Sequence, residues 1–193
     1  MRPKRRQNES ALVCAARLGD KEALRLLLTG NWGWLKGLVY GIVRDTDAVD
    51  DVLQEICVRV ISNIDTLREP ERFRPWLATL ARRQALQYSR HQDQRPIPLN
   101  PDRADEQCDE KAQTSFENME KREQCRRILE AVKGLPEKYR EVFLLQYSSD
   151  LTYDQVAEIL DIPVTTMQIR LVRARRMIHD KVAGKNRDRV QET

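Results

Sequence analysis

The chain has 193 residues, a formal net charge of +4 and a sequence pI near 8.9, so its length suits one ordinary domain or two small ones. A third of the residues are charged and only seven are glycine, which favours a helical protein over a sheet protein. No apolar run approaches the ~18 residues that span a bilayer, and no apolar segment follows the basic N-terminus. We therefore expect no membrane insertion, no export and a cytoplasmic location.

The cysteines are too scattered to form a metal site. Cys14, Cys57, Cys108 and Cys125 include no C-x-x-C pair, and the chain has only two histidines. A zinc site needs four closely spaced donors. We expect reduced thiols, no metal and no cofactor.

Helical periodicity runs from Ser10 to about His91. Within it, DAVDDVLQEI predicts a helix from Asp47 to Val60 with an apolar stripe that faces a core. The opposite face carries Asp47, Asp50, Asp51, Gln54 and Glu55. This acidic face is either a solvated surface, with acids favoured near a helix start, or a docking face for a basic protein partner.

A second amphipathic segment follows at residues 71–92, and Pro75 suits its first turn. Core positions are predicted for Phe73, Leu77, Leu80 and Tyr88. A ridge along the adjacent edge consists of Arg72, Trp76, Thr79, Arg83 and Arg90. An aromatic ring between arginines suits single-stranded nucleic acid, because bases stack on the ring and guanidiniums hold phosphates. A boundary tryptophan with solubilising arginines is equally consistent with the pattern.

Residues 93–118 interrupt the helical pattern with prolines and polar residues, and predict a linker. The segment from Pro101 to Glu120 contains seven acidic and two basic residues, so this linker is acidic. Helical pattern resumes near Phe116, and residues 184–193 form a polar tail. The predicted fold is all-α, with one small helical domain at 1–92 and another at 119–183, joined by a flexible acidic linker.

The C-terminal domain contains a predicted helix-turn-helix. Thr152 and Gln155 have the spacing of a capping box and predict a helix from Tyr153, and Thr165 and Gln168 repeat that spacing after a turn. The second helix has a buried stripe at Met167, Leu171, Ala174 and Ile178. Its outward face carries Thr165, Ile169, Val172, Arg173 and Arg176, flanked by Gln168, Arg170 and Arg175.

That outward face suits a reader of the DNA major groove. Arginine can bind guanine, glutamine can bind adenine, and an apolar side chain can contact the thymine methyl group. The segment from Val164 to Val190 contains eight basic and two acidic residues, and this positive charge indicates a polyanionic partner. A purely structural helical hairpin is the alternative.

These stretches, in this order, resemble the bacterial sigma factors of the extracytoplasmic function (ECF) type. ARLGDKEAL is similar to the family's opening helix and turn, and DAVDDVLQEI to its acidic helix. FRPWLATLARRQALQYSR is similar to its F-R-x-W-L…A-R-N-x-A-L-x-Y motif, and LPEKYREVFLLQYSSDLTYDQVAEIL and VRARRMI to its C-terminal domain. The resemblance covers residues 11–91 and 127–182.

The resemblance implies a role for each surface. The acidic helix would dock on the clamp of core RNA polymerase through Asp47, Asp50, Asp51, Gln54 and Glu55. The −10 element would be bound and melted by Arg72, Phe73, Trp76, Thr79, Arg82 and Arg83. The −35 element would be read by Thr165, Thr166, Gln168, Ile169, Arg170, Val172, Arg173 and Arg176. The implied partners are core polymerase, promoter DNA and an anti-sigma factor that the sequence does not identify, with a monomer as the free state.

Departures from the family pattern predict altered promoter preferences. Arg83 occupies a position where the family commonly has asparagine. Gln168 and Ile169 occupy positions where the family usually has a basic residue and a serine. A stand-alone helix-turn-helix regulator is the alternative function, but it leaves the acidic helix without a role and usually needs a dimer. Two-metal chemistry on nucleic acid would need converging carboxylates, whereas Asp47 to Glu55 lie along one helix face, so we expect no enzyme.

Overall fold

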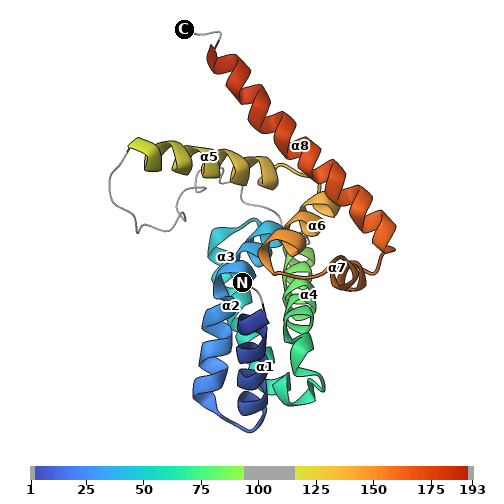
Figure 1. Ribbon diagram of the computed structural model, residues 1–193. Helices are drawn as coiled ribbons and strands as arrows, with labels where there is room; N and C mark the ends of the chain where they lie inside the picture. The colour runs from blue at the N-terminus through green and yellow to red at the C-terminus, as the bar shows by residue number, and fades with distance from the viewer. Residues whose placement is uncertain (1–2, 94–115, 191–193) are drawn as a thin grey trace.

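The computed structural model describes residues 3–93 and 116–190, and every regular element in these two ranges is helical (Figure 1). The N-terminal half contains α1 (Pro3–Arg17), α2 (Lys21–Val43), α3 (Thr46–Asn63) and α4 (Phe73–Asp93), with 3-10 turns η1 (Ile64–Thr66) and η2 (Pro70–Arg72) before α4. The C-terminal half contains α5 (Phe116–Lys133), α6 (Glu137–Ser148), α7 (Tyr153–Leu160) and α8 (Val164–Val190). The all-α prediction is confirmed, and the predicted linker at 93–118 lies largely outside the described residues.

Capping residues define where the helices α2 and α3 of the N-terminal half begin and end. The Asp20 carboxylate accepts from the backbone N–H groups of Glu22 and Ala23, at 2.9 and 3.1 Å, and so caps α2. Arg44 ends α2 in the left-handed region at φ 62°, and Asp45 caps α3 by accepting from the N–H of Asp47. These local signals end α2 at Val43 and begin α3 at Thr46, directly after it.

The first of the two predicted capping boxes is confirmed. The Thr152 hydroxyl accepts from the N–H of Gln155 at 3.3 Å, and the Gln155 side-chain oxygen accepts from the N–H of Thr152 at 3.0 Å. The second prediction is wrong, because α8 begins at Val164 and Thr165 lies inside its first turn. The carbonyl of Pro163, not a threonine cap, accepts the helical bond from the N–H of Met167 at 3.0 Å.

The predicted polar tail at 184–193 is helical as far as Val190. Lysine and arginine are good helix formers, and no proline interrupts the segment. The one glycine, Gly184, costs about 1 kcal/mol, which does not end a helix that is already propagating.

The two halves pack directly against each other. Figure 1 shows α6 and α7 beside the ends of α2 and α4. One hydrophobic core contains Phe73 and Leu77 of the N-terminal half together with Val142, Leu145 and Val156 of the C-terminal half. A smaller cluster joins α5, α6 and α8. The expected linker therefore connects two helical units that share a buried interface.

Gly41 permits a close approach across this interface. A Cβ atom at Gly41 would lie 2.0 Å from Cδ1 of Leu144 on α6. The helices α2 and α6 can approach this closely because residue 41 has no side chain.

Candidate functional site

The acidic face of α3 is exposed as the sequence predicts. Its apolar stripe, Val49, Val52, Leu53, Ile56 and Val60, is fully buried. The opposite face exposes all five expected residues, Asp47, Asp50, Asp51, Gln54 and Glu55. Its ion pairs are peripheral: Lys36 Nζ lies 3.4 Å from Asp50, and Arg59 Nε lies 2.9 Å from Glu55. The face is therefore open to a partner.

Two exposed apolar residues extend this face and were missed in the sequence. Val58 and Ile61 are 56% and 57% exposed. Their spacing from Asp51 and Gln54, in steps of three and four, places them on the acidic face rather than on the buried stripe. Exposed β-branched side chains next to carboxylates favour a protein-docking surface over a plain solvated face.

The ridge of α4 divides into buried and accessible parts. Thr79 and Arg83 are exposed, whereas Arg72, Trp76 and Arg82 are half-buried. The Trp76 ring centroid lies 5.9 Å from that of Phe73. Phe73 itself is only 1% exposed, so in this structure it is a core residue that supports Trp76 and does not reach the surface.

Two arginines of the expected −10 surface are paired with the C-terminal half. Arg72 Nη2 donates to the Glu158 carboxylate on α7 at 2.6 Å. Arg82 donates to the Glu141 carboxylate on α6, from Nε at 3.1 Å and from Nη2 at 3.2 Å. The Glu141 side chain is only 8% exposed, and Arg82 supplies the opposite charge that a buried carboxylate needs.

A third arginine, Arg74, forms a buried network that sequence reasoning missed. Its Nε donates to Glu9 at 2.9 Å and its Nη1 to the Ser149 carbonyl at 3.2 Å. Glu9 also accepts from Asn31 Nδ2 at 3.0 Å, and Asn31 Oδ1 accepts from Trp34 Nε1 at 2.7 Å. The partners lie 65 and 75 residues from Arg74, so no local spacing could reveal them.

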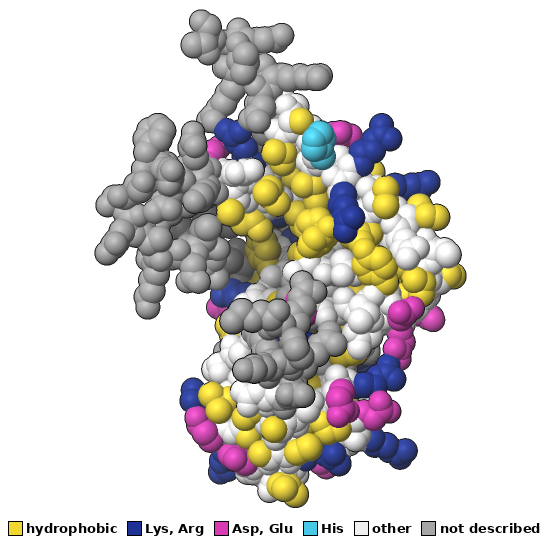
Figure 2. All heavy atoms as spheres, in the orientation of Figure 1, with side chains coloured by type: hydrophobic (Ala, Val, Ile, Leu, Met, Phe, Trp, Pro, Cys, Tyr) yellow, Lys and Arg dark blue, Asp and Glu magenta, His cyan; other side chains and the backbone are white. Residues whose placement is uncertain are grey.

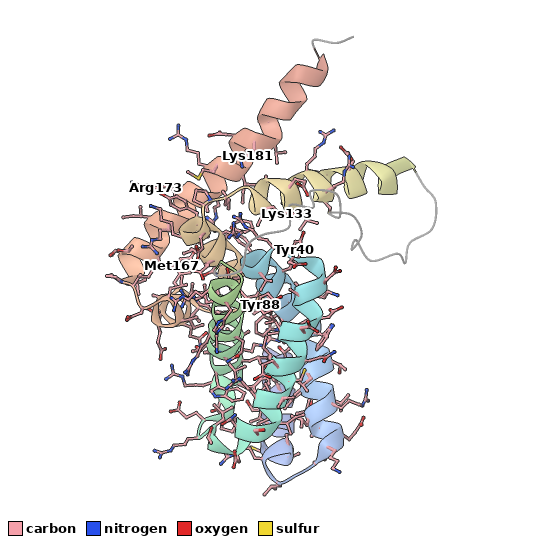
Figure 3. The ribbon with its side chains drawn as sticks, turned by 180° about the vertical axis from the view of Figure 1, so that it is seen from behind. Tyr40, Tyr88, Lys133, Met167, Arg173 and Lys181 are labelled. Carbon is pink, nitrogen blue, oxygen red and sulfur yellow. The ribbon has the colours of Figure 1, made fainter. Side chains whose placement is uncertain are left out.

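The outward face of α8 is as predicted. Met167, Leu171, Ala174 and Ile178 are buried, and Figure 3 shows Met167 and Arg173 in the first half of α8. Ile169 and Val172 are 53% and 62% exposed. The remaining expected −35 residues are exposed or half-buried: Thr165, Gln168, Arg173 and Arg176 are exposed, and Thr166 and Arg170 are half-buried. An apolar centre with basic surroundings is therefore presented to solvent.

Tyrosines of α6 hold two arginines beside this face. The Arg175 guanidinium lies 5.4 Å from the Tyr147 ring centroid, within cation–π range. Arg173 is hydrogen-bonded to Tyr139, and this bond lowers the pKa of the Tyr139 hydroxyl. Neither contact was expected from the sequence, because each tyrosine meets its arginine only once α6 has packed on α8.

The C-terminal half also has an apolar groove. Its volume is about 400 Å³, and it is lined by Ile128, Phe143, Arg175, Ile178, His179, Val182 and Ala183. Figure 2 shows apolar side chains gathered where α5, α6 and α8 meet.

Within residues 3–93 and 116–190, no three His, Cys, Asp or Glu side chains are grouped so that they could hold a metal ion. Three of the cysteines, Cys14, Cys57 and Cys125, are free thiols, and Cys108 lies outside the described residues. None of the described helices is long and apolar enough to span a bilayer.

The sequence matches two family models in chain order. Residues 27–95 match Sigma-70 region 2, and residues 125–178 match Sigma-70, region 4. The ECF RNA polymerase sigma-E factor of Haemophilus influenzae is 30% identical over 182 residues, covering 90% of this chain and 95% of that protein. The sigma-E factor of Escherichia coli K12 is 31% identical over 180 residues, covering 90% and 94%.

Solved structures share the fold. CnrH in complex with the cytosolic domain of CnrY aligns with a TM-score of 0.65 at 20% identity, covering 92% of this chain and 98% of that chain. The sigma factor RpoE in complex with the anti-sigma factor NepR from Bartonella quintana aligns with a TM-score of 0.66 at 17% identity, covering 82% and 96%. The fold, the order of the family regions and the full-length similarity agree, and the chain belongs to the ECF RNA polymerase sigma factors, which direct promoter-specific initiation of transcription.

Proposed function

We propose that three surfaces of this sigma factor each bind a different partner during the initiation of transcription. The acidic face of α3 binds core RNA polymerase, the α4 ridge binds and melts the −10 element, and the outward face of α8 reads the −35 element. The observation that carries this assignment is the exposure of Asp47, Asp51 and Glu55 over a fully buried stripe, with Val58 and Ile61 continuing the same face. Charged and apolar groups together on an exposed helix face suit a basic, partly apolar protein partner.

The domain boundaries follow from the same assignment. Residues 1–92 form the domain that binds polymerase and the −10 element, and residues 119–183 form the −35 domain. Residues 93–118 connect the two.

Melting in this scheme needs no catalytic residue. Bases that open transiently are captured on Trp76 and its neighbouring arginines, and each capture shifts the equilibrium toward open DNA. We therefore propose that the chain is not an enzyme, that it works in the cytoplasm where core polymerase acts, and that the free protein is a monomer.

An anti-sigma factor is a further proposed partner. RpoE of Bartonella quintana is in complex with such a protein, NepR, and CnrH is in complex with the cytosolic domain of CnrY. We extend this type of partner to the present chain because its fold aligns with both.

Transcription in vitro tests the proposal. The purified chain is added to sigma-free core polymerase on a pooled promoter library, and RNA 5′ ends are mapped. We expect starts downstream of one shared two-part motif, and we expect them to be lost when Asp51 and Glu55 are both changed to lysine.

The matched control reverses two exposed acids outside the face, Glu22 and Glu130, to lysine, and should initiate normally. If the control loses activity to the same degree, the α3 assignment fails. If no starts are found but the chain alone binds DNA tightly, the data support a stand-alone helix-turn-helix regulator instead.

A further inference from the structure

Two arginines in the first half of α8 are held by tyrosines of α6. The Arg175 guanidinium lies 5.4 Å from the Tyr147 ring centroid, and Arg173 is hydrogen-bonded to Tyr139. The helices α6 and α8 pack against each other, and Figure 1 shows them crossing. Among the residues that the structure describes, no carboxylate lies within ion-pair distance of either arginine.

A tyrosine holds an arginine without neutralising its charge. Arg127 on α5 shows the other case, because its Nε donates to the Glu123 carboxylate at 3.1 Å. A carboxylate takes the guanidinium donors that a phosphate would use, and it cancels the positive charge. A neutral ring or hydroxyl does not cancel the charge. Arg173 and Arg175 are therefore oriented by the protein and still carry a positive charge for an anionic partner.

Tyr147 is anchored although much of it is exposed. The residue is 53% exposed, and its ring centroid lies 4.5 Å from that of Phe143, with an angle of 37° between the ring planes. Phe143 is half-buried and packs against both hydrophobic clusters of the fold. A continuous stack from the core through Phe143 and Tyr147 thus supports the exposed Arg175.

The two arginines lie on opposite sides of the outward face of α8. They are two residues apart, which separates them by about 200° around the helix axis. In this projection the exposed Ile169 and Val172 lie between them. A helix in the major groove has a phosphate backbone on each side, while the centre of its face meets the base edges. The arrangement therefore presents one held cation toward each backbone.

We propose that Tyr139 and Tyr147 are positioning residues for DNA binding, which hold Arg173 and Arg175 toward the phosphate backbones on the two sides of the groove. This inference rests on the proposed −35 role of α8 and adds Arg175 to its contacts. An arginine that is already held loses less side-chain entropy when it binds a phosphate. The tyrosines contribute to affinity through the arginines, and other side chains of α8 read the bases.

Substitutions at the two tyrosines separate the role of the ring from that of the hydroxyl. Tyr147 acts through its ring, so Tyr147→Phe should bind DNA as the wild type does and Tyr147→Leu should release Arg175. Tyr139 acts through its hydroxyl, so Tyr139→Phe should release Arg173. The matched control is Trp32→Leu, which removes an aromatic ring that is 38% exposed on α2. Circular dichroism checks that each variant is folded.

Fluorescence anisotropy of the full-length chain on a labelled duplex measures the effect. The duplex carries the −35 half of the motif that the mapped RNA 5′ ends define, and affinity is measured between about 50 and 200 mM salt. We expect Tyr147→Leu and Tyr139→Phe to bind about two- to tenfold more weakly, because a released arginine must be ordered on binding. Tyr147→Phe and the Trp32→Leu control should keep the wild-type affinity.

The salt dependence of binding reports the phosphate contact itself. Arg175→Ala should lower the slope of log affinity against log salt by about 1, as expected for the loss of one phosphate contact. Arg126→Ala is the charge control, because Arg126 is an exposed arginine on α5 that is paired with Glu123. It should leave the slope unchanged. An unchanged slope for Arg175→Ala would show that Arg175 contacts no phosphate and would overturn its part of the proposal.

A double-mutant cycle distinguishes positioning from a general structural role. In the Arg175→Ala background, Tyr147→Leu should cause no further loss of affinity, because the arginine that it holds is absent. The same should hold for Tyr139→Phe in the Arg173→Ala background. Equal losses in the wild-type and alanine backgrounds would mean that the tyrosines act on the fold and not through the arginines.

The proposed −35 role has its own readout in the same experiment. If the wild-type chain binds the motif duplex no better than a duplex of scrambled sequence, the −35 assignment of α8 fails, and the inference fails with it. If the wild type prefers the motif while Tyr147→Leu and Tyr139→Phe keep its affinity, only the positioning role is wrong.

Discussion

Arg74, in the first turn of α4, donates from Nη1 to the main-chain carbonyl of Ser149, 3.2 Å away at the end of α6. Both residues are buried, so the bond is shielded from water. The same guanidinium reaches Glu9 on α1, which makes this one side chain a link between α1, α4 and the C-terminal half. Its neighbours Arg72 and Arg82 also cross between the halves, but through more exposed contacts.

Replacing Arg74 should strongly destabilise the protein. Arg74→Met leaves the Glu9 carboxylate and the Ser149 carbonyl without this donor, and removing one partner of a buried pair costs about 3 to 5 kcal/mol. Urea unfolding followed by circular dichroism measures the change in the free energy of unfolding. Arg25→Met is the control, because Arg25 pairs with Glu22 on the exposed side of α2 and should change stability little. Equal stability of the two variants would contradict the buried-network interpretation.

The residues at the start of α8 should set the −35 preference. Gln168 and Ile169 are exposed on the outward face, and glutamine and an apolar side chain favour adenine and thymine edges. Binding-site selection with Gln168→Lys and Ile169→Ser should shift the selected bases, at about 1 to 3 kcal/mol of discrimination for each good contact.

The control for this selection is Gln124→Lys, which adds the same charge at an exposed position on α5. It should return the wild-type motif. An unchanged motif for both α8 variants would show that these two positions do not read bases.

Trp76 should be needed for promoter melting more than for folding. Trp76 is half-buried, and stacking of an unpaired base on an aromatic ring contributes about 1 to 3 kcal/mol. Trp76→Ala should reduce permanganate reactivity of thymines in the −10 region of the holoenzyme complex. Trp76→Phe keeps an aromatic surface and should retain most of it. If both variants melt the promoter normally while both stay folded, the stacking role is wrong.

The free thiols should differ in reactivity. Burial raises the pKa of the Cys57 thiol, so at a pH below that value Cys57 carries less of the reactive thiolate than an ordinary cysteine. Cys14 and Cys125 are exposed. With iodoacetamide near pH 8, we expect Cys14 and Cys125 to be alkylated before Cys57, as followed by mass spectrometry of the peptides. Earlier modification of Cys57 would mean that α3 opens readily in solution.

Local sequence determined the helices and the sides they expose. The spacing of Val49, Val52 and Ile56 was sufficient to orient α3, because a helix repeats every 3.6 residues whatever it packs against. The same holds for the buried stripe of α8 and for the Thr152–Gln155 cap, whose partners are three residues apart. The start of α8 was misplaced because Thr165 and Gln168 have the spacing of a cap, while the carbonyl of Pro163 already accepts the first helical bond.

Only the tertiary structure decided how the arginines of α4 are used. Arg72 at the end of η2 and Arg74 and Arg82 on α4 look alike in the sequence, yet each has a partner in the other half, 59 to 86 residues away. Such pairings depend on how α6 and α7 pack on α2 and α4, and that packing depends on shape, including the missing side chain at Gly41. Periodicity shows which residues share a face, whereas the shared core decides which faces meet.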